Sequence, residues 1–443
     1  MSQNMLESTA TDLGRLIEAG EISPSELTQT YLDAIDAHPL AHRIYARTTP
    51  ERAIYEASTA TARAVQGTRY GPLDGVPISW KDLFDTDGAG TEAGSAFLKG
   101  RVPRADAEVL KNATLGGLVC LGKTHMSELA FSGLGLNPVT QSPPCVNDPN
   151  AVAGGSSSGA AASVAFNIAA AAIGSDTGGS VRIPSAWNDL VGLKTTSGLL
   201  SLKGVVPLCA KFDTVGPLCR SVEDAANLFA ALGGTQAMQL QNTGLKGKRF
   251  AICSTLALDT LEDAPKNAFM LAVQSLKDAG AIVEELDIPE INAAMPLAGC
   301  LFTTEAYAQW QSEIDTTPEL MYPAIRDRFL IGKTFSGYEY VQAWQKLDQL
   351  RESYLKRTAG YDAVLLPSSP ILPPNVEKLE QDSEYYISAN LLALRNTRIG
   401  NLMGLCGLTL PTSLPSCGLM ICCSPFEERK LLTLGANIEA VLK

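Results

Sequence analysis

Histidine is scarce in this sequence, which holds only His38, His42 and His125 among its 443 residues. A Ser-His-Asp triad would need one of the three beside a nucleophilic serine. His38 and His42 flank Pro39 in a segment typical of a loop and are expected at the surface, whereas His125 is expected to be a solvated or hydrogen-bonded structural residue. A catalytic base, if the chain has one, is therefore sought among carboxylates and lysines.

Basic residues are outnumbered as well: 35 Lys and Arg stand against 47 Asp and Glu, for a net charge of −12 and a pI near 4.9. Nucleic-acid binding draws its affinity from Lys and Arg on phosphates, so this balance argues against a nucleic acid as the main partner. With 45% hydrophobic and 19% charged residues, the composition is typical of a globular protein with a sizeable core.

Long hydrophobic runs are missing too. The run at 168–173, with its alanine-rich approach, is too short to span a bilayer, so no membrane helix is predicted. The first ten residues are polar and contain no basic stretch followed by an apolar one, which is unlike a secretory signal. A cytoplasmic location is expected.

Cysteine occurs ten times, but no two cysteines form a Cys-x-x-Cys pair. Only one histidine, His125, lies near a cysteine, so the ligand spacing of a zinc site is absent and no metal is expected. The ten cysteines are predicted to be buried thiols. Cys422 and Cys423 point to opposite faces if their segment is a strand.

Hydrophobic periodicity alternates between short buried strands and amphipathic helices. The predicted strands cover residues 76–81, 118–121, 249–253, 281–286, 363–366, 408–410 and 418–422. The predicted helices cover residues 5–19, 23–38, 51–66, 105–115, 159–172, 222–232, 264–279, 338–357 and 427–442. This alternation predicts an α/β sheet with helices on both faces. Without an internal repeat or a long linker, a single domain over residues 1–443 is expected.

Two motif matches fail on physical grounds. Residues 117–124 match the P-loop pattern, but their middle residues are strand-like, whereas a phosphate cradle needs a glycine-rich loop between a strand and a helix. Residues 155–159 match the nucleophile elbow of α/β-hydrolases, with Ser157 at the centre. That fold needs a histidine later in the chain, and all three histidines come earlier.

Two glycine-serine turns carry the strongest chemical signal. The turns at 154–156 and 178–180 flank the helix predicted at 159–172, which can place both at one site. N–H groups of the second turn can form an oxyanion hole with Ser180 at its mouth, and Ser156 can relay a proton. The alternative is that both are structural turns capped by serines.

Lys81 is the strongest candidate for the base that a serine hydroxyl needs. The residues before it, 76–80, are mostly apolar, and a desolvated amine favours its neutral form. A lysine that is solvated at a strand end, or paired with Asp82, fits the spacing equally well. Asp176 and Arg182 straddle the second turn at positions suited to a supporting ion pair.

Together these motifs resemble the amidase signature family of serine amidases. The segments 75–82, 154–157, 174–182 and 191–195 occur in the order found in that family. The separations, 75 residues from Lys81 to Ser156 and 24 from Ser156 to Ser180, are similar to those of its Ser-Ser-Lys triad. The resemblance extends weakly over nearly the whole chain.

This resemblance implies a role for each motif. Ser180 is the expected nucleophile, Ser156 the bridging serine after a cis peptide bond, Lys81 the final base and Ser157 a supporting residue. The N–H groups of the oxyanion hole would come from Thr177, Gly178, Gly179 and Ser180. The implied reaction is attack on an amide, release of ammonia or an amine, and hydrolysis of the acyl-enzyme, with no metal or organic cofactor.

The same resemblance implies a mixed sheet and three regions within the single domain. These are a helical N-terminal arm at about 1–66, a signature core at about 71–215 and a substrate-pocket region at about 248–443. The chain departs from the family at Ser158 and Ala160, where glycine and a small polar residue are common, and at 417–423, which replaces a usual Pro-x-Gly-Leu-Gln run. The first departure leaves the triad intact, and the second weakens a close subfamily assignment.

Three arginines, Arg328, Arg395 and Arg398, are the residues from which the class of substrate is inferred. Arg328 is similar in setting to the arginine that holds the substrate carboxylate in the glutaminase subunit of tRNA-dependent amidotransferases, although a surface position on an amphipathic helix is the alternative. The acidic residue that this glutaminase uses for the α-amino group has no counterpart in residues 392–398, which disfavours free glutamine. Arg328 with Arg395 or Arg398 suggests a small acidic amide or ureide, as in the carboxybiuret and allophanate hydrolases of the family. A neutral aryl or alkyl amide such as indoleacetamide is the competing substrate.

Three classes of protein fit the resemblance: a free-standing amidase, a catalytic subunit that feeds ammonia to a partner, and a non-catalytic scaffold. The scaffold is disfavoured because all three triad positions are present. The expected partner is a small-molecule amide, and a homodimer or a small partner subunit is compatible with the sequence.

Overall fold

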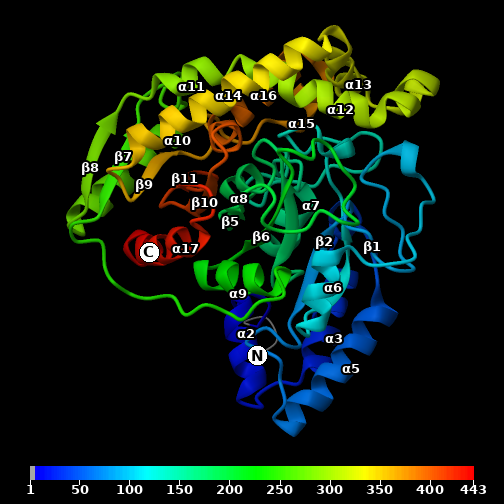
Figure 1. The fold of residues 1–443 in the computed structure, drawn as a ribbon. Helices are drawn as coiled ribbons and strands as arrows, with labels where there is room; N and C mark the ends of the chain where they lie inside the picture. Colours follow the sequence, from blue (N-terminus) through cyan, green and yellow to red (C-terminus); the bar gives the residue numbers. More distant parts are fainter. Residues whose placement is uncertain (1–4) are drawn as a thin grey trace.

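The computed structural model describes residues 5–443, so the first four residues of the predicted polar N-terminus lie outside it. One eleven-stranded sheet runs through the molecule in the order β1-β3-β2-β4-β6-β5-β10-β11-β9-β7-β8 (Figure 1). The strands are β1 Tyr45–Thr48, β2 Pro77–Lys81, β3 Val119–Thr124, β4 Ala172–Asp176, β5 Val191–Lys194, β6 Thr214–Cys219, β7 Arg249–Cys253, β8 Ile282–Leu286, β9 Ala363–Pro367, β10 Cys406–Pro411 and β11 Gly418–Cys423.

The sheet is mixed, as expected. Strand β2 runs parallel to both β3 and β4, and β7 runs parallel to both β8 and β9. Between these two parallel blocks, the pairs β4–β6, β6–β5, β5–β10, β10–β11 and β11–β9 are antiparallel. The fold is a single-domain α/β architecture around this sheet.

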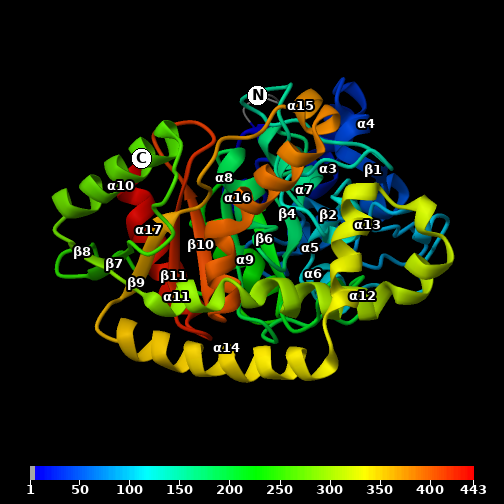
Figure 2. The same cartoon turned by 90° about the horizontal axis from the view of Figure 1, so that it is seen from above.

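Helices cover both faces of the sheet (Figures 1 and 2). They are α2 Ala10–Glu18, α3 Pro24–Ala37, α4 Ala41–Ile44, α5 Pro50–Gln66, α6 Glu108–Leu115, α7 Ser158–Ala165, α8 Arg182–Trp187, α9 Val222–Leu232, α10 Asp263–Asp278, α11 Pro289–Ala294, α12 Leu297–Thr316, α13 Pro323–Leu330, α14 Gly337–Thr358, α15 Val376–Gln381, α16 Ser383–Leu402 and α17 Glu428–Leu442. Among residues 5–443, no helix is both long and apolar enough to cross a membrane.

Strand β10 demonstrates the two-sided cover. A Cβ added to Gly407 would lie 3.5 Å from the Arg182 side chain of α8, while a Cβ added to Gly435 of α17 would lie 2.3 Å from Leu408. Adjacent strand residues face opposite sides of a sheet, so α8 and α17 pack on opposite faces. Gly435 is needed here because any larger residue would collide with Leu408.

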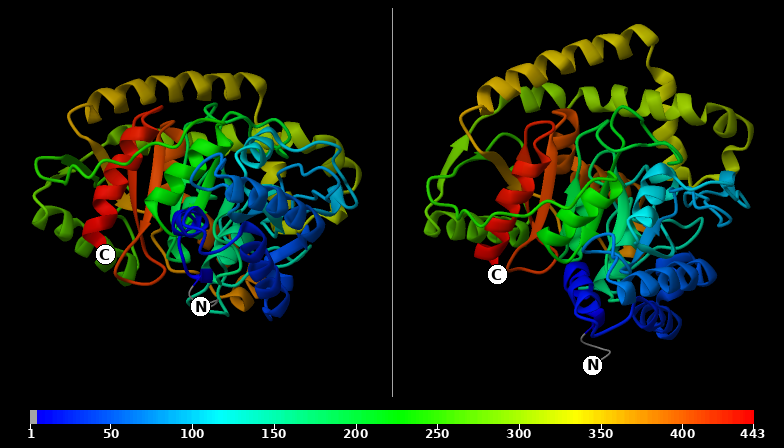
Figure 3. Two further views of the ribbon diagram at one scale, coloured as in Figure 1. Left: turned by 90° about the horizontal axis from the view of Figure 1, so that it is seen from below. Right: turned by 60° about the horizontal axis from the view of Figure 1, so that its bottom comes forward.

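The two ends of the molecule have different cover. Helices α11 to α14 and α16 lie together at the top of Figure 1, and Figure 2 shows the long α14 and α12 running side by side there. The N-terminal helices α2, α3 and α5 lie at the opposite end, as Figure 3 shows from below. Helix α3 begins with the capping box of Ser23 and Glu26 that its sequence is typical of.

The prediction of one helix over 159–172 is wrong. Helix α7 ends at Ala165, Asn167 adopts a left-handed conformation with φ of 60°, and the Ile168 N–H donates to the Ser163 carbonyl. This is a helix-terminating pattern that asparagine can adopt. The residues beyond it enter strand β4, and a fully buried apolar run has no periodicity that distinguishes strand from helix.

Other segment predictions compare well with the structure. Strand β7 and helix α9 have the predicted bounds, and most remaining elements differ by one or two residues. Strands β1, β4, β5 and β6 and helices α4, α8, α11, α12, α13, α15 and α16 are additional to those predicted. The P-loop match falls on strand β3, which confirms that it lacks the required glycine loop.

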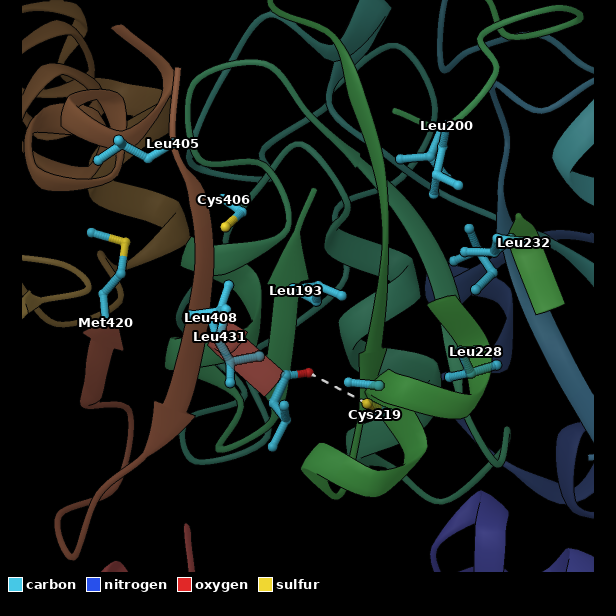
Figure 4. Close-up of a cluster of buried hydrophobic side chains, with 14 of the residues drawn as sticks. Leu193, Leu200, Cys219, Leu228, Leu232, Leu405, Cys406, Leu408, Met420 and Leu431 are labelled. Atoms are coloured by element: carbon cyan, nitrogen blue, oxygen red, sulfur yellow. Dashed lines mark hydrogen bonds between the residues drawn. The ribbon is translucent and has the colours of Figure 1, made fainter. Parts of the chain in front are cut away.

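All ten cysteines are buried and free, as predicted. Figure 4 shows Cys219 and Cys406 among leucines of the core, including Leu193, Leu408 and Leu431. The Cys219 thiol donates to a strand carbonyl, that of Val191, at 3.8 Å. These thiols act as small apolar side chains within the packing.

The histidines are placed largely as expected. His42 is exposed, and His38 is partly buried with its ring edge-on to Phe166 at 5.4 Å. His125 is buried, and burial lowers its pKa to about 4, so it is neutral at pH 7. None of the three lines the pocket that holds Ser180.

Candidate active site

Lys81, the last residue of strand β2, lies in the interior of the molecule. Its side chain is fully buried, and Nζ donates to the Ser156 hydroxyl at 2.7 Å and the Ser175 hydroxyl at 2.8 Å. Asp82, the next residue, faces the other way and pairs with Arg47 at 2.7 Å. Both alternatives, a lysine solvated at the strand end and a lysine paired with Asp82, are therefore wrong.

Burial changes the acidity of this amine. Desolvation lowers the pKa of Lys81 to about 7, against the opposing charges of Asp176 and Asp213. A substantial fraction of Lys81 is therefore neutral at pH 7 and able to accept a proton. The two serine hydroxyls are the groups that it contacts.

The two glycine-serine turns meet in space. The Gly155–Ser156 peptide bond is cis, as the resemblance implied, and the Ser157 N–H donates to the Ser180 carbonyl at 3.2 Å. Both turns thus lie beside Lys81, although α7 is shorter than the helix expected to join them. The short helix, the turn at 166–171 and strand β4 together bring the chain back to the same site.

Ser175 is a member of this group that the sequence reasoning missed. Besides accepting from Lys81, it exchanges hydrogen bonds with Ser157: the Ser157 hydroxyl donates to the Ser175 carbonyl at 3.2 Å and accepts from its N–H at 3.3 Å. Ser157 thereby braces β4 against the first turn, which agrees with the supporting place expected for it. Recognising 172–176 as a strand would have pointed to Ser175, because alternate residues share a face.

Asp176 and Arg182 form the expected ion pair, with both side chains fully buried. The guanidinium donates to both carboxylate oxygens at 2.9 and 3.0 Å, and Asn401 of α16 donates to Oδ1 at 2.9 Å. Burial alone would raise the pKa of Asp176, but the Arg182 charge and these hydrogen bonds outweigh it, so its pKa lies well below the usual range. The carboxylate also accepts from the N–H groups of Gly179 and Val181, and so shapes the second turn from within.

The Gly179 N–H donates to Asp176 at 2.9 Å, which corrects its expected place in the oxyanion hole. Among residues 5–443, the N–H groups of Thr177, Gly178 and Ser180 have no protein acceptor and remain free to donate. Gly179 is required for another reason: its φ is 140°, and a Cβ there would lie 2.1 Å from the Thr397 hydroxyl.

Two further residues missed by the sequence reasoning hold the walls of the site. The Thr177 hydroxyl donates to buried Asp213 at 2.5 Å, and Asp213 also accepts from the N–H groups of Leu208 and Cys209. Glu128 accepts from the Tyr322 N–H at 2.9 Å, which attaches the start of α13 to the core. Neither carboxylate stands in a recognisable motif, so only the tertiary structure identifies them.

Ser180 lines a pocket whose remaining wall comes from distant segments. The lining residues are Ala130, Phe131, Ser132, Thr177, Gly178, Leu208, Phe302, Arg328, Leu394 and Arg398. Three of them, Phe302, Arg328 and Arg398, also line a larger cavity of about 720 Å³ between α12, α13 and α16. The inner pocket, of about 20 Å³, and the larger outer cavity therefore share part of one wall.

The three candidate arginines have different places. Arg328 lies in the pocket, where it donates to the Phe131 carbonyl at 2.9 Å and stacks over the Phe131 ring at 4.2 Å. Arg398 lines both cavities. Arg395 lies outside them and donates to Thr260 at 3.1 Å.

We expect Asp176→Asn to destabilise the protein strongly, by about 3–5 kcal/mol, because it leaves the buried Arg182 guanidinium without a counter-charge. Urea unfolding followed by fluorescence measures this as a lower midpoint. Glu284→Gln is the matched control, since its pair with Arg249 is exposed and no shift of midpoint is expected. Equal midpoints for Asp176→Asn and the wild type would mean that the pair does not hold the turn.

Comparison with known proteins assigns the chain to a family. A family model described as Amidase matches residues 26–432. The chain is 34% identical over 388 residues to the 2-amino-5-chloromuconic acid deaminase of Comamonas testosteroni, covering 85% of this chain and 84% of that protein. It is 30% identical over 475 residues to a glutamyl-tRNA(Gln) amidotransferase subunit of Geobacter sp. (strain M21), covering 97% and 96%.

Solved structures agree. A crystal structure of an amidase matches with a TM-score of 0.88 at 30% identity, over 98% of this chain and 100% of that one. The peptide amidase of Stenotrophomonas maltophilia matches with a TM-score of 0.82 at 25% identity, over 98% and 97%. The chain therefore belongs to the amidase family and is an amide hydrolase.

Proposed function

We propose that the protein hydrolyses the amide bond of a small carboxylate-bearing substrate through a serine acyl-enzyme. The observation that carries this proposal is the hydrogen bond from fully buried Lys81 to Ser156, beside the pocket that contains Ser180. A neutral amine in contact with one serine, and a second serine facing a cavity, are the parts that histidine-free serine catalysis needs.

In the proposed first step, the Ser180 oxygen attacks the amide carbon. Its proton passes to Ser156, whose own proton passes to neutral Lys81. The amide oxygen becomes an oxyanion that accepts hydrogen bonds from the free N–H groups of Thr177, Gly178 and Ser180. Asp213 holds Thr177 in place for this purpose through the Thr177 hydroxyl.

In the second step the tetrahedral intermediate collapses. Ser156 returns a proton to the departing nitrogen, Lys81 replaces the proton on Ser156, and ammonia or an amine leaves with the Ser180 ester behind. Water then attacks the ester carbon while the same relay takes its proton; the bond to the Ser180 oxygen breaks, the relay returns the proton to that oxygen, and the carboxylic acid product is released. Ser157, Asp176 and Arg182 support the turns and take no proton.

The carboxylate on the substrate is proposed from Arg328, whose guanidinium faces the pocket with only a carbonyl acceptor, that of Phe131. The relative from Comamonas testosteroni is named for an acid as its substrate, which is in accord with this proposal. A charge-assisted hydrogen bond from a guanidinium suits a carboxylate.

We expect Arg328→Met to lower kcat/KM for carboxylated amides about 10- to 100-fold, the effect of losing a hydrogen bond to a charged group. Ammonia release from a panel of half-amides of dicarboxylic acids measures this. Neutral alkanamides should change little. Arg326→Met is the matched control on the same helix, because Arg326 pairs with Asp327 and does not line the pocket. An unchanged rate on carboxylated amides would contradict the role of Arg328.

A neutral aryl or alkyl amide is the second candidate substrate. The outer cavity supports it, because Met295, Ile331, Ile387 and Leu391 give that cavity an apolar lining. The half-amide panel with matched alkanamides separates the two candidates by their relative kcat/KM. The similarity to a glutamyl-tRNA(Gln) amidotransferase component supports a third candidate, an ammonia-supplying role within a complex, which the mass of the native complex would test.

A further inference from the structure

Arg328 and Arg398 contribute to the lining of both the inner pocket and the outer cavity. They come from different helices, α13 and α16, and both line both spaces. None of the other residues that line the inner pocket is acidic. The one carboxylate on the outer cavity, Asp327, is paired with Arg326 at 2.8 Å.

Neither guanidinium has a counter-charge in the part of the chain that the structure describes. Within residues 5–443, neither Arg328 nor Arg398 forms an ion pair, and the Arg398 side chain forms no hydrogen bond. Arg220 is a useful contrast, because it also lacks an ion pair but donates to the carbonyls of Val164 and Ala170 and to the Asn167 side chain. The five N–H donors of Arg398 are thus available to a ligand.

The two charges also repel each other. Burial lowers the pKa of Arg398 to about 9, and the nearby charge of Arg328 acts in the same direction. Burial lowers the pKa of Arg328 to about 10. Both remain positive at pH 7, so the pocket holds two partly buried like charges, and a bound anion relieves their repulsion.

Resting on the proposed function, we propose that Arg328 and Arg398 bind one and the same carboxylate of the substrate, and that Arg398 makes the enzyme prefer anionic to neutral amides. Because both arginines line the pocket of Ser180 and also the outer cavity, which Ser180 does not line, we place this carboxylate at the end of the acyl chain that points away from Ser180. The substrate class is then an amide whose acyl chain ends in a carboxylate, such as a half-amide of a dicarboxylic acid.

The test compares each half-amide from malonamate to adipamate with the alkanamide of equal chain length. Arg398→Met should lower kcat/KM for the best half-amide about 10- to 100-fold and change that of the alkanamide by less than about 3-fold. Arg395→Met, three residues earlier on α16 and outside both cavities, is the matched control and should leave both rates unchanged. Equal effects of Arg398→Met on both substrates, or no effect on either, would overturn the proposal.

A double variant tests whether the carboxylate is shared. If Arg328 and Arg398 hold one carboxylate, the loss in Arg328→Met/Arg398→Met is smaller than the product of the two single losses. If the two single losses in kcat/KM multiply in the double variant, the arginines bind two separate anionic groups, and the proposal of one shared carboxylate is overturned. Arg398→Lys keeps a charge and should recover part of the rate, and thermal melting of each variant confirms that it is folded.

The two proposals fail in different ways. The arginine proposal would be contradicted, and the serine mechanism supported, if Ser180→Ala lost all amide turnover and the wild type preferred alkanamides. Turnover retained in Ser180→Ala would sink the mechanism itself. A wild type that hydrolyses no half-amide in the series overturns the arginine proposal as well.

Discussion

Ser180→Ala is expected to reduce amide turnover by about 10³-fold or more, because the variant lacks the atom that forms the acyl-enzyme. Ammonia release over time measures the loss. The fold should be retained, since the Ser180 backbone carbonyl, which accepts from the Ser157 N–H, is unchanged. The effect therefore belongs to chemistry and not to stability.

Covalent labelling gives the same prediction a second readout. A fluorophosphonate probe, mapped by mass spectrometry, should mark Ser180 in the wild type and leave the variant unlabelled. Ser163→Ala is a matched control. Ser163 is buried in α7, its hydroxyl is hydrogen-bonded to the Ser79 hydroxyl at 2.7 Å, and it does not line the pocket of Ser180. Labelling of another serine in the wild type would refute the assignment of the nucleophile.

Lys81→Met should have the second large effect. Removing a general base typically costs about 10²- to 10⁴-fold, and we expect a loss of about 10³-fold in kcat. Methionine fills most of the lysine volume but cannot accept the proton from Ser156. Measurement of kcat with saturating amide, alongside thermal melting, separates this loss from unfolding.

The pH profile makes the prediction about Lys81 specific. The base is the neutral amine, so kcat/KM of the wild type should be low below about pH 6, rise with a midpoint near 7, and level off above it. Lys123→Met is the control: Lys123 is also buried, on the adjacent β3, but donates to the Phe84 carbonyl and the Thr91 hydroxyl. It should keep the wild-type midpoint. A rate that does not change between about pH 5 and 9 would contradict the role of Lys81.

Particular residues show which parts of the candidate site the sequence patterns could predict. Lys81, Ser156 and Ser180 could be proposed because each stands in a short motif that resembles one of the amidase signature family. The helix predicted over 159–172 was wrong because a buried run of small apolar residues has no face to distinguish strand from helix. Ser175 was missed with it, since its place beside Lys81 follows from the alternation of strand β4.

Residues of the site that lie outside motifs could be recognised only from the fold. Asp213 and Glu128 are ordinary carboxylates in the sequence, and only folding places one on Thr177 and the other at the start of α13. The same is true of the choice between Arg395 and Arg398. These residues are three apart on α16, yet one donates to Thr260 and the other faces the pocket.

The sequence by itself determined the α/β class and the scarcity of histidine, because these depend on local pattern and residue type, and the three residues of the proposed triad follow from its resemblance to the amidase signature family. The tertiary structure decided that Lys81 is desolvated, that Gly179 donates to Asp176, and that Arg328 and Arg398, which form no ion pair among residues 5–443, line the pocket of Ser180. Desolvation, hydrogen-bond partners and the pairing of charges are properties of groups far apart in the chain that folding brings together, so no local pattern carries them.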